Sequence, residues 1–342
     1  MVREENMDLK MIAWEVTRSC NLACSHCRAS SKYGPYPGEL TSGESFRLID
    51  EIASFSRPVI ILTGGEPLLR KDIFEIADYA KNKGLRLVMA PNGTLLCDEN
   101  IEKIIRCGIK RISVSLDGPD ETSHDNLRQV PGAFKRAIQG IKKAKDAGLE
   151  FQINSTISKR NIKSIFEIMK LAKDSGAIAH HIFLLVPTGR AKQMAGEELS
   201  AQEYEEALQL LAEEKKKSDL EIKVTCAPHF NRILLQEGYD NPANLRGRGC
   251  MAGKSFCFIS HTGDLQPCGY LEIKCGNIRD TGFKKAWLSA DVFNNLRERS
   301  KYKGKCAVCE FKLVCSGCRA RAYAKYKDYL REEPYCAYEP GR

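Results

Sequence analysis

A strand-then-helix rhythm repeats through the first half of the chain and constrains the fold more than any other feature of the sequence. Apolar runs of strand length alternate with stretches of helical character, at about 25–35 residues per unit, the size of a βα repeat. Several of the helical stretches stop at a glycine, as helices commonly do. The apolar runs are 11–17, 58–64, 86–92, 111–117, 150–156 and 180–186, and the helical stretches are 42–55, 71–83, 98–107, 132–147 and 163–175.

The apolar runs are nearly continuous rather than alternating, which is typical of strands buried on both faces of a parallel sheet. Six such units are too few for a closed eight-stranded barrel, so we predict an α/β fold with a partial (β/α)6 TIM-like barrel. A doubly wound sheet is the competing architecture. A doubly wound sheet usually has a glycine-rich turn after its first strand, and this chain has TRSCNLAC there instead.

The pattern of predicted elements and the residue composition change towards the C-terminus. A charged amphipathic helix is predicted over 200–217, and a further strand, EIKVT, over 221–225. After Asp240 the elements become short, while cysteine, glycine and lysine become more frequent. We therefore predict a barrel domain over 1–199, a bridging helix and strand over 200–244, and a small cysteine-rich domain over 245–342. Metal, more than a hydrophobic core, is expected to hold that last domain together.

Composition excludes several classes of protein. No apolar run approaches the length of a membrane span, and the polar N-terminus, MVREENMDLK, has no apolar segment typical of a secretory signal. The net charge of +9 suits an anionic ligand or a redox cofactor, but no signature of nucleic-acid binding accompanies it. The chain has 15 cysteines, which are clustered. A cytosolic chain that keeps so many thiols usually uses them as metal ligands, so we predict a cytoplasmic protein with metal-bound thiolates.

Three cysteines directly follow the first predicted strand, with the spacing Cys20-x3-Cys24-x2-Cys27. Chemistry in parallel α/β proteins takes place at the C-terminal ends of strands, and this loop lies there. Three thiolates can hold three irons of a 4Fe–4S cube and leave the fourth iron for another ligand. Zinc is the alternative, but it would need a fourth ligand, and His26 is poorly placed to complete a tetrahedron.

A second motif, Thr63-Gly64-Gly65-Glu66-Pro67, follows the second predicted strand. Its glycines allow the backbone to approach a ligand closely, and Glu66 supplies a carboxylate at the same end of the barrel. An ordinary turn would explain the glycines but not the glutamate.

Together the two motifs resemble the radical S-adenosylmethionine (SAM) superfamily. The resemblance implies that Cys20, Cys24 and Cys27 hold a 4Fe–4S cluster whose open iron binds the amino and carboxylate groups of SAM. Reductive cleavage of SAM would then give a 5′-deoxyadenosyl radical. The turn of Gly64, Gly65 and Glu66 would contact the methionine amino group. The other implied SAM-site residues, each of which could instead be an ordinary turn residue, are Asn92, Ser115, Asp117, Arg128 and Asn154.

Besides Cys275, which stands apart, the C-terminal region has eight further cysteines, enough for two fully ligated 4Fe–4S clusters or for structural zinc sites. Their pattern resembles the SPASM extension of radical SAM enzymes, but the spacing between Cys315 and Cys318 is one residue shorter than is usual there. A single auxiliary cluster therefore stays open as an alternative. The resemblance implies one cluster on Cys250, Cys257, Cys268 and Cys318, and another on Cys306, Cys309, Cys315 and Cys336.

Basic residues are concentrated beside these cysteines. Nine Lys and Arg but only two acids lie within 301–331. Such cations would stabilise anionic clusters, although a solvated basic helix at CRARAYAKYK explains the run equally well.

Stretches through nearly the whole chain, among them IAWEVTRSCNLACSHCRA, HHIFLLVPTGRA and KCAVCEFKLVCSGCRARAYA, resemble the haem-forming radical SAM family of the alternative haem pathway. That resemblance implies oxidative decarboxylation of two propionates of Fe-coproporphyrin III to vinyl groups, giving haem b. An auxiliary cluster would accept one electron per vinyl group, and ferredoxin or flavodoxin would supply electrons. We expect His229 as an axial ligand of the substrate iron, with Cys226 and Arg190 as further substrate contacts. A structural histidine and a buried apolar thiol are the alternatives for the first two.

Three other functions stay open. One is the sister radical SAM enzyme that removes acetate groups from didecarboxysirohaem. Another is a SPASM peptide maturase, although such enzymes usually carry an N-terminal peptide-binding domain, and the first strand here begins at Met11. The third is a non-enzymatic iron–sulfur electron carrier or zinc scaffold, which would yield no 5′-deoxyadenosine from SAM.

Overall fold

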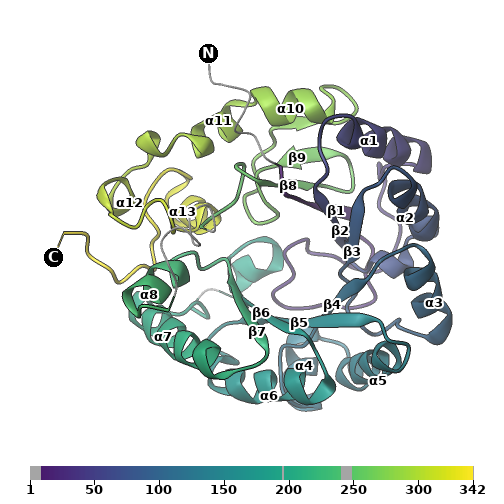
Figure 1. Cartoon of the computed structure of the whole chain (residues 1–342), viewed down its shortest axis with the longest axis horizontal. Coiled ribbons are helices and arrows are strands. Elements are labelled where there is room, and N and C mark those ends of the chain that lie inside the picture. Colours follow the sequence, from purple (N-terminus) through teal and green to yellow (C-terminus); the bar gives the residue numbers. More distant parts are fainter. Residues whose placement is uncertain (1–8, 195, 240–248, 342) are drawn as a thin grey trace.

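The structure is a computed structural model that describes residues 9–194, 196–239 and 249–341. Its strands form one curved sheet at the centre of a ring of helices (Figure 1). The order of the strands in the sheet is β10-β9-β8-β1-β2-β3-β4-β5-β6-β7. Their bounds are β1 Met11–Thr17, β2 Val59–Gly64, β3 Arg86–Met89, β4 Arg111–Ser115, β5 Glu150–Ile157, β6 Ala179–Leu184, β7 Glu221–Thr225, β8 Phe256–Ile259, β9 Asp264–Gln266 and β10 Gly276–Asn277.

Neighbouring strands from β1 to β7 pair in parallel, and this confirms the predicted partial α/β barrel. All six predicted strands exist. The EIKVT strand, assigned above to a bridging segment, extends the barrel by pairing with β6. The helices are α1 Ser42–Phe55, α2 Ile73–Asn82, α3 Asp98–Arg106, α4 Glu121–Arg128, α5 Ala133–Asp146, α6 Ile165–Ser175, α7 Ala201–Lys217, α8 Phe230–Gln236, α10 Phe283–Ser289, α11 Asp291–Arg297, α12 Lys305–Val308 and α13 Arg319–Tyr326.

Local signals explain where the helices start and stop. Helix α1 begins at a capping box, in which Thr41 accepts from the backbone of Glu44 and Glu44 accepts from the backbone of Thr41. After α6, Gly176 has a φ of +90°, a conformation that favours glycine and ends the helix. Each helix then returns the chain to the start of the next strand, which keeps the C-terminal ends of the strands on one side.

The cysteine-rich C-terminal region is joined to the barrel by backbone pairing. Strand β8 pairs in parallel with β1, and β9 pairs antiparallel with β8. The largest hydrophobic core runs through both regions, because Trp14 of β1 and Trp287 of α10 belong to the same buried cluster. The expectation of a C-terminal domain held by metal in place of a hydrophobic core is therefore wrong for β8, β9 and α10, whose buried side chains share the core of the barrel.

The predicted domain boundaries stay a proposal. The sheet continues past residue 199, since β7 follows it, and the boundary at 244 lies outside the described residues. The N-terminal residues 1–8, on which the inference of no secretory signal depends, also lie outside them.

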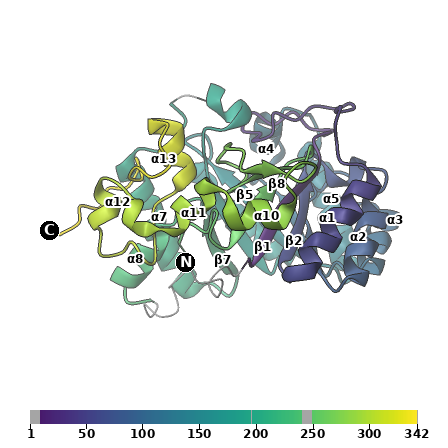
Figure 2. The same cartoon turned by 90° about the horizontal axis from the view of Figure 1, so that it is seen from above.

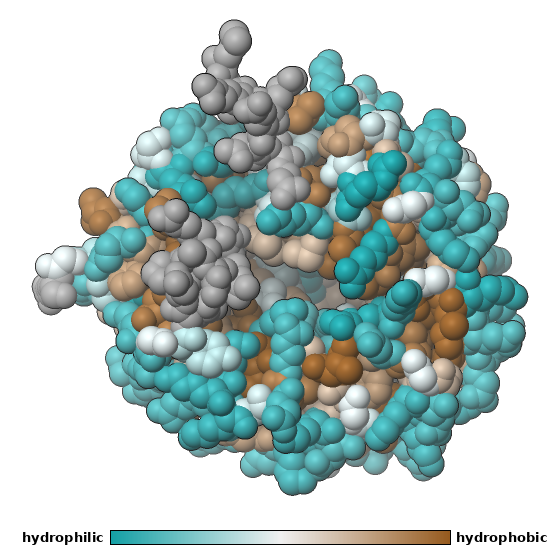
Figure 3. Space-filling model, viewed as in Figure 1, coloured by the Kyte–Doolittle hydropathy of each residue, from teal (hydrophilic) through white to brown (hydrophobic). Residues whose placement is uncertain are grey.

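The loop after β1 and helix α4 lie on the same side of the sheet (Figure 2). Backbone hydrogen bonds join them, from Ala23 N to Arg128 O (3.2 Å) and from Ser25 N to Leu127 O (2.9 Å). On the face seen in Figure 3, hydrophilic residues cover the outer helices and hydrophobic residues gather nearer the centre. In the described part of the chain, no helix combines the length and apolar character needed to cross a bilayer.

Candidate active site

The three predicted ligands of the first cluster lie together in the loop after β1. Cys20, Cys24 and Cys27 pack in one small group with Leu22 and Ala133. Cys20 and Cys24 are less than one-tenth exposed, and none of the three forms a disulfide. Burial, together with the nearby Glu66, raises the pKa of the Cys20 thiol to about 12. Three clustered soft donors, two of them buried, beside an acidic group fit a bound cationic centre, which would deprotonate them.

The glycines of the second motif press against the backbone of this loop. Gly65 N donates to Thr17 O at 2.8 Å, and Glu66 N donates to Ser19 O at 2.8 Å. A Cβ at position 65 would lie 2.2 Å from Ser19 O, so only glycine allows this approach. The motif therefore sets the path of the chain that leads into the three cysteines, in addition to its predicted contact with SAM.

Glu66 is fully buried and lies near Cys20. Its Oε2 accepts from Asn92 N at 2.6 Å, and its Oε1 accepts from Leu68 N at 3.1 Å. Burial raises the pKa of Glu66 to about 7, against the opposing effect of these hydrogen bonds. The Asn92 side chain approaches the Cys20 sulfur at 3.9 Å. Both predicted residues thus lie beside the loop, and their roles towards SAM stay proposals.

Arg128 and Asp117 form a buried ion pair against the second cysteine of the loop. Arg128 Nη2 lies 2.7 Å from Asp117 Oδ2, and Arg128 Nη1 lies 3.5 Å from Cys24 Sγ. Burial lowers the pKa of Arg128, but Asp117 and Cys24 outweigh it and keep the guanidinium charged. His26 adds a contact of 3.3 Å to Asp117, while burial lowers the pKa of its ring to about 4 and keeps it neutral.

Ser115 and Asn154 are side by side at the ends of β4 and β5, in register with each other. The Asn154 side chain accepts from Gln152 at 3.0 Å. Their predicted contacts with SAM are not tested by this geometry and stay proposals.

Arg190 lies against the backbone of the cysteine loop. Its Nε donates to Cys24 O at 2.8 Å, and its Nη1 donates to Ser31 O at 2.6 Å. Its backbone N–H donates to Cys27 O at 3.0 Å. These donors hold the carbonyl groups of the cysteine loop, and the predicted contact of Arg190 with substrate stays a prediction.

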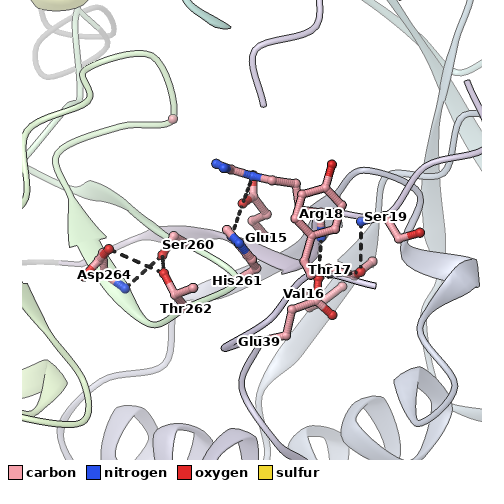
Figure 4. Close-up of polar contacts among 12 residues, drawn as sticks. Glu15, Val16, Thr17, Arg18, Ser19, Glu39, Ser260, His261, Thr262 and Asp264 are labelled. Carbon is pink, nitrogen blue, oxygen red and sulfur yellow. Dashed lines mark hydrogen bonds and ion pairs between the residues drawn. The ribbon is translucent and has the colours of Figure 1, made fainter. Parts of the chain in front are cut away.

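The sequence analysis missed a charged network beneath the same loop. Glu15, fully buried on β1, pairs with Arg28 and accepts from Arg18 at 3.2 Å. His261, between β8 and β9, lies 2.7 Å from Glu15 Oε1, and Glu39 accepts from the backbone of Arg18 at 2.8 Å (Figure 4). An acidic residue inside the apolar run MIAWEVT was the signal that could have revealed it. The network links the cysteine loop to the C-terminal region.

A cavity in the C-terminal region brings together all four cysteines predicted for the second auxiliary cluster. Cys306, Cys309, Cys315 and Cys336 line it. His229 lines the same cavity; it is 1% exposed, and neither of its ring nitrogens has a hydrogen-bond partner in the structure. The structure thus places His229 beside the cysteines predicted for the second auxiliary cluster, and its expected axial role at a substrate iron stays a prediction.

Only three of the four cysteines predicted for the first auxiliary cluster lie together. We call them the thiol trio: Cys250, Cys268 and Cys318. Cys257 is separated from them, in the main core beside Cys275. Cys226, expected at the substrate, packs with two members of the trio. The predicted role of Cys257 as a ligand therefore has no support from its position and stays a prediction.

Two arginines of the basic run are buried beside these cysteines. Arg319 and Arg321, at the start of α13, are 0% and 1% exposed. Arg321 pairs with Glu333 at 2.9 Å, whereas Arg319 approaches the Cys306 sulfur at 3.6 Å. The alternative of a wholly solvated basic helix is therefore wrong for this turn. Buried cations beside clustered thiols fit anionic iron–sulfur clusters.

Comparisons with known proteins agree with these sites. A family model described as the radical SAM superfamily matches residues 14–172, and one described as an iron-sulfur cluster-binding domain, SPASM, matches residues 250–310. Both imply 4Fe–4S clusters and SAM as cofactors. The crystal structure of SuiB from Streptococcus suis bound to S-adenosylmethionine has a TM-score of 0.77 and covers 97% of this chain and 78% of that one. At 15% identity, that likeness shows the fold alone.

Two curated relatives extend along almost the whole chain. The "AdoMet-dependent heme synthase" of Nitratidesulfovibrio vulgaris is 48% identical and covers 97% of this chain and 93% of its own length. The "Fe-coproporphyrin III synthase" of Methanosarcina barkeri is 32% identical over 95% of this chain and 87% of its own length. The chain therefore belongs to the AdoMet-dependent heme synthase family of radical SAM enzymes and carries a C-terminal SPASM domain.

Proposed function

We propose that this enzyme converts Fe-coproporphyrin III to haem b by oxidative decarboxylation of two propionate groups to vinyl groups. The observation that carries the proposal is the 48% identity with a heme synthase along 97% of the chain. The identity to the Fe-coproporphyrin III synthase of Methanosarcina barkeri is lower, at 32%.

When bound, the first cluster and SAM supply the radical that removes a hydrogen atom from the propionate. Each propionate then loses CO₂ and one electron as the vinyl group forms, so a nearby acceptor is needed. The two groups of clustered thiols in the C-terminal region support an acceptor there. A low-potential donor such as ferredoxin or flavodoxin is the proposed source of the electron that cleaves SAM.

The chain's own residues position these components. The three cysteines of the loop hold the first cluster, and the backbone at Gly65 and the donors of Arg190 fix the path of that loop. Low exposure of Cys20 and Cys24 excludes water from the site of radical formation. Glu66 and Asn92 are the proposed contacts of the methionine part of SAM. The predicted cytoplasmic location stays a prediction.

Anaerobic incubation of the reconstituted protein with SAM, a reductant and Fe-coproporphyrin III tests this function. We expect a mono-vinyl and then a di-vinyl product by chromatography and mass spectrometry, with two molecules of 5′-deoxyadenosine for each haem. A parallel reaction contains didecarboxysirohaem in place of Fe-coproporphyrin III. Loss of acetate groups there, or SAM cleavage with no change in Fe-coproporphyrin III, would contradict the proposal.

A further inference from the structure

Cys226 follows β7 directly, at the junction between the barrel and the C-terminal region. Its φ of +62° lies in the left-handed region, which is uncommon for a residue with a side chain. Arg321 holds this conformation by donating to the Cys226 carbonyl oxygen. Because Arg321 lies three residues after Cys318, the same helix positions both cysteines.

The side chain of Cys226 lies among the members of the thiol trio. It packs in a small cluster with Cys318 and Cys268, separate from the main core. Its thiol is also within electrostatic reach of Cys318, Cys268 and Cys250. Members of the trio interact with one another in the same way: Cys268 with Cys250 and Cys318, and Cys318 with Cys250. Three thiols from separate segments thus pack together, and a fourth, that of Cys250, lies within electrostatic reach of all three.

Cys257 cannot join this group, for a reason that lies in the geometry of a strand. Successive side chains of a strand point to opposite faces of the sheet. Phe258 of β8 packs its ring against the Arg28 guanidinium, 4.4 Å from the ring centroid, on the side of the cysteine loop. Cys257 therefore points the other way, into the main core, where it is 0% exposed and lies near Cys275 and Arg297.

We propose that Cys226 supplies the fourth thiolate of the first auxiliary cluster, together with the thiol trio, and that Cys257 is a structural thiol of the core. The thiolate of Cys226 would bind iron with loss of its proton to solvent, as the other ligands do. This assignment rests on the iron–sulfur clusters of the family and not on the porphyrin reaction.

The test measures the clusters themselves, without SAM or porphyrin. In a background with Cys20, Cys24 and Cys27 replaced by alanine, only auxiliary clusters remain after anaerobic reconstitution. In that background we expect Cys226→Ala to lose about four irons and four sulfides per chain, or to convert one cluster to a three-iron form visible by electron paramagnetic resonance. Cys257→Ala, the matched control, should keep the full iron and sulfide content.

A conservative variant separates ligation from packing. Cys226→Ser keeps a side chain of similar size but offers oxygen to iron, so we expect an altered resonance or Mössbauer spectrum even where iron is retained. Cys257→Val keeps the core apolar and should leave the spectrum unchanged. An unchanged spectrum for Cys226→Ser, or loss of a cluster in a Cys257→Val protein with native circular dichroism, would overturn the assignment. Neither result would touch the porphyrin reaction, which is measured separately by its products.

Discussion

The two cysteine-bearing regions of this protein neutralise charge in different ways. In the barrel, three thiols lie beside Arg128, whose charge is already balanced by Asp117 at 2.7 Å. In the C-terminal region, Arg319 is fully buried beside Cys306 and, within the described residues, has no carboxylate in an ion pair. A cube with three thiolates carries a net charge of about −1 and one with four about −2. Arg319, the surplus cation, thus lies where the more anionic cluster is expected.

The difference also concerns how each region is held. The loop after β1 depends on donors from other elements, namely Gly65, Arg128 and Arg190. The C-terminal cysteines come from separate segments that meet around buried arginines. In the barrel, the cysteines therefore lie on one loop whose path is fixed by hydrogen bonds from other elements. In the C-terminal region, the cysteines lie on several segments that a bound cluster would join. Four predictions test this contrast, beginning with the largest expected effect.

Cys24→Ala should abolish 5′-deoxyadenosine formation, because it leaves the first cluster with two thiolates. Cys309→Ala should keep SAM cleavage but impair formation of vinyl groups, since it affects the proposed electron acceptor. Both products are measured by liquid chromatography of anaerobic reactions. Equal loss of SAM cleavage in both variants would remove the functional distinction between the two regions.

Gly65→Ala should lower the rate of SAM cleavage by about 100-fold, since misplacement of a site by about 1 Å has an effect of that size. The added Cβ would meet Ser19 O at 2.2 Å and Arg18 O at 2.6 Å, so the cysteine loop must shift. Spectra of the auxiliary clusters should stay unchanged. Gly43→Ala is a matched control, because the φ of Gly43 is outside the left-handed region and a Cβ there would meet only the Arg47 side chain, at 3.8 Å. Normal kinetics for Gly65→Ala would contradict the role of the motif in shaping the loop.

Glu15→Gln should destabilise the iron-free protein by up to about 3 kcal/mol at pH 7. Burial raises the pKa of Glu15, but Arg28, His261 and Arg18 outweigh it and lower the pKa from 4.5 to about 2. A lowered pKa contributes stability that is present above pH 4.5 and lost as the pH falls towards 2. Urea unfolding at several pH values should therefore show the free energies of unfolding of the wild-type and Glu15→Gln proteins converging near pH 2. A difference in free energy that stays constant with pH would refute the link between the charge of Glu15 and stability.

Arg319→Gln should have the smallest effect on the stability of the protein but a specific effect on the midpoint potential of the second auxiliary cluster. In the iron-free protein, removal of a buried cation relieves its desolvation cost and offsets the lost hydrogen bonds to Tyr329 O and Arg331 O. In the loaded protein, the midpoint potential of the second auxiliary cluster should become more negative, because a nearby positive charge is lost. Redox titration followed by electron paramagnetic resonance measures it. An unchanged potential would mean that the surplus cation does not act on the cluster.

The sequence predicted the strands of the barrel well because they are buried on both faces and read as unbroken apolar runs. Helix α4 was missed: its segment, ETSHDNLR, has no apolar stripe, and it forms under the N-cap of Asp120 and contacts with the cysteine loop. The spacing of cysteines suggested Cys257 as a ligand, but spacing carries no information on which face of a strand a side chain occupies. The contacts of Arg190 with the cysteine loop could not be predicted, because hydrogen bonds to backbone carbonyls leave no pattern in the sequence.

The pairing of β1 with β8 has a consequence for biosynthesis. Met11 lies beside Phe256 in the sheet, so one edge of the first strand stays without its neighbour until most of the polypeptide has left the ribosome. An open strand edge invites pairing with other chains, and contacts between such distant segments form slowly. The nascent protein should therefore depend on protection of that edge during translation, and delivery of iron and sulfide to the C-terminal cysteines can only follow its closure.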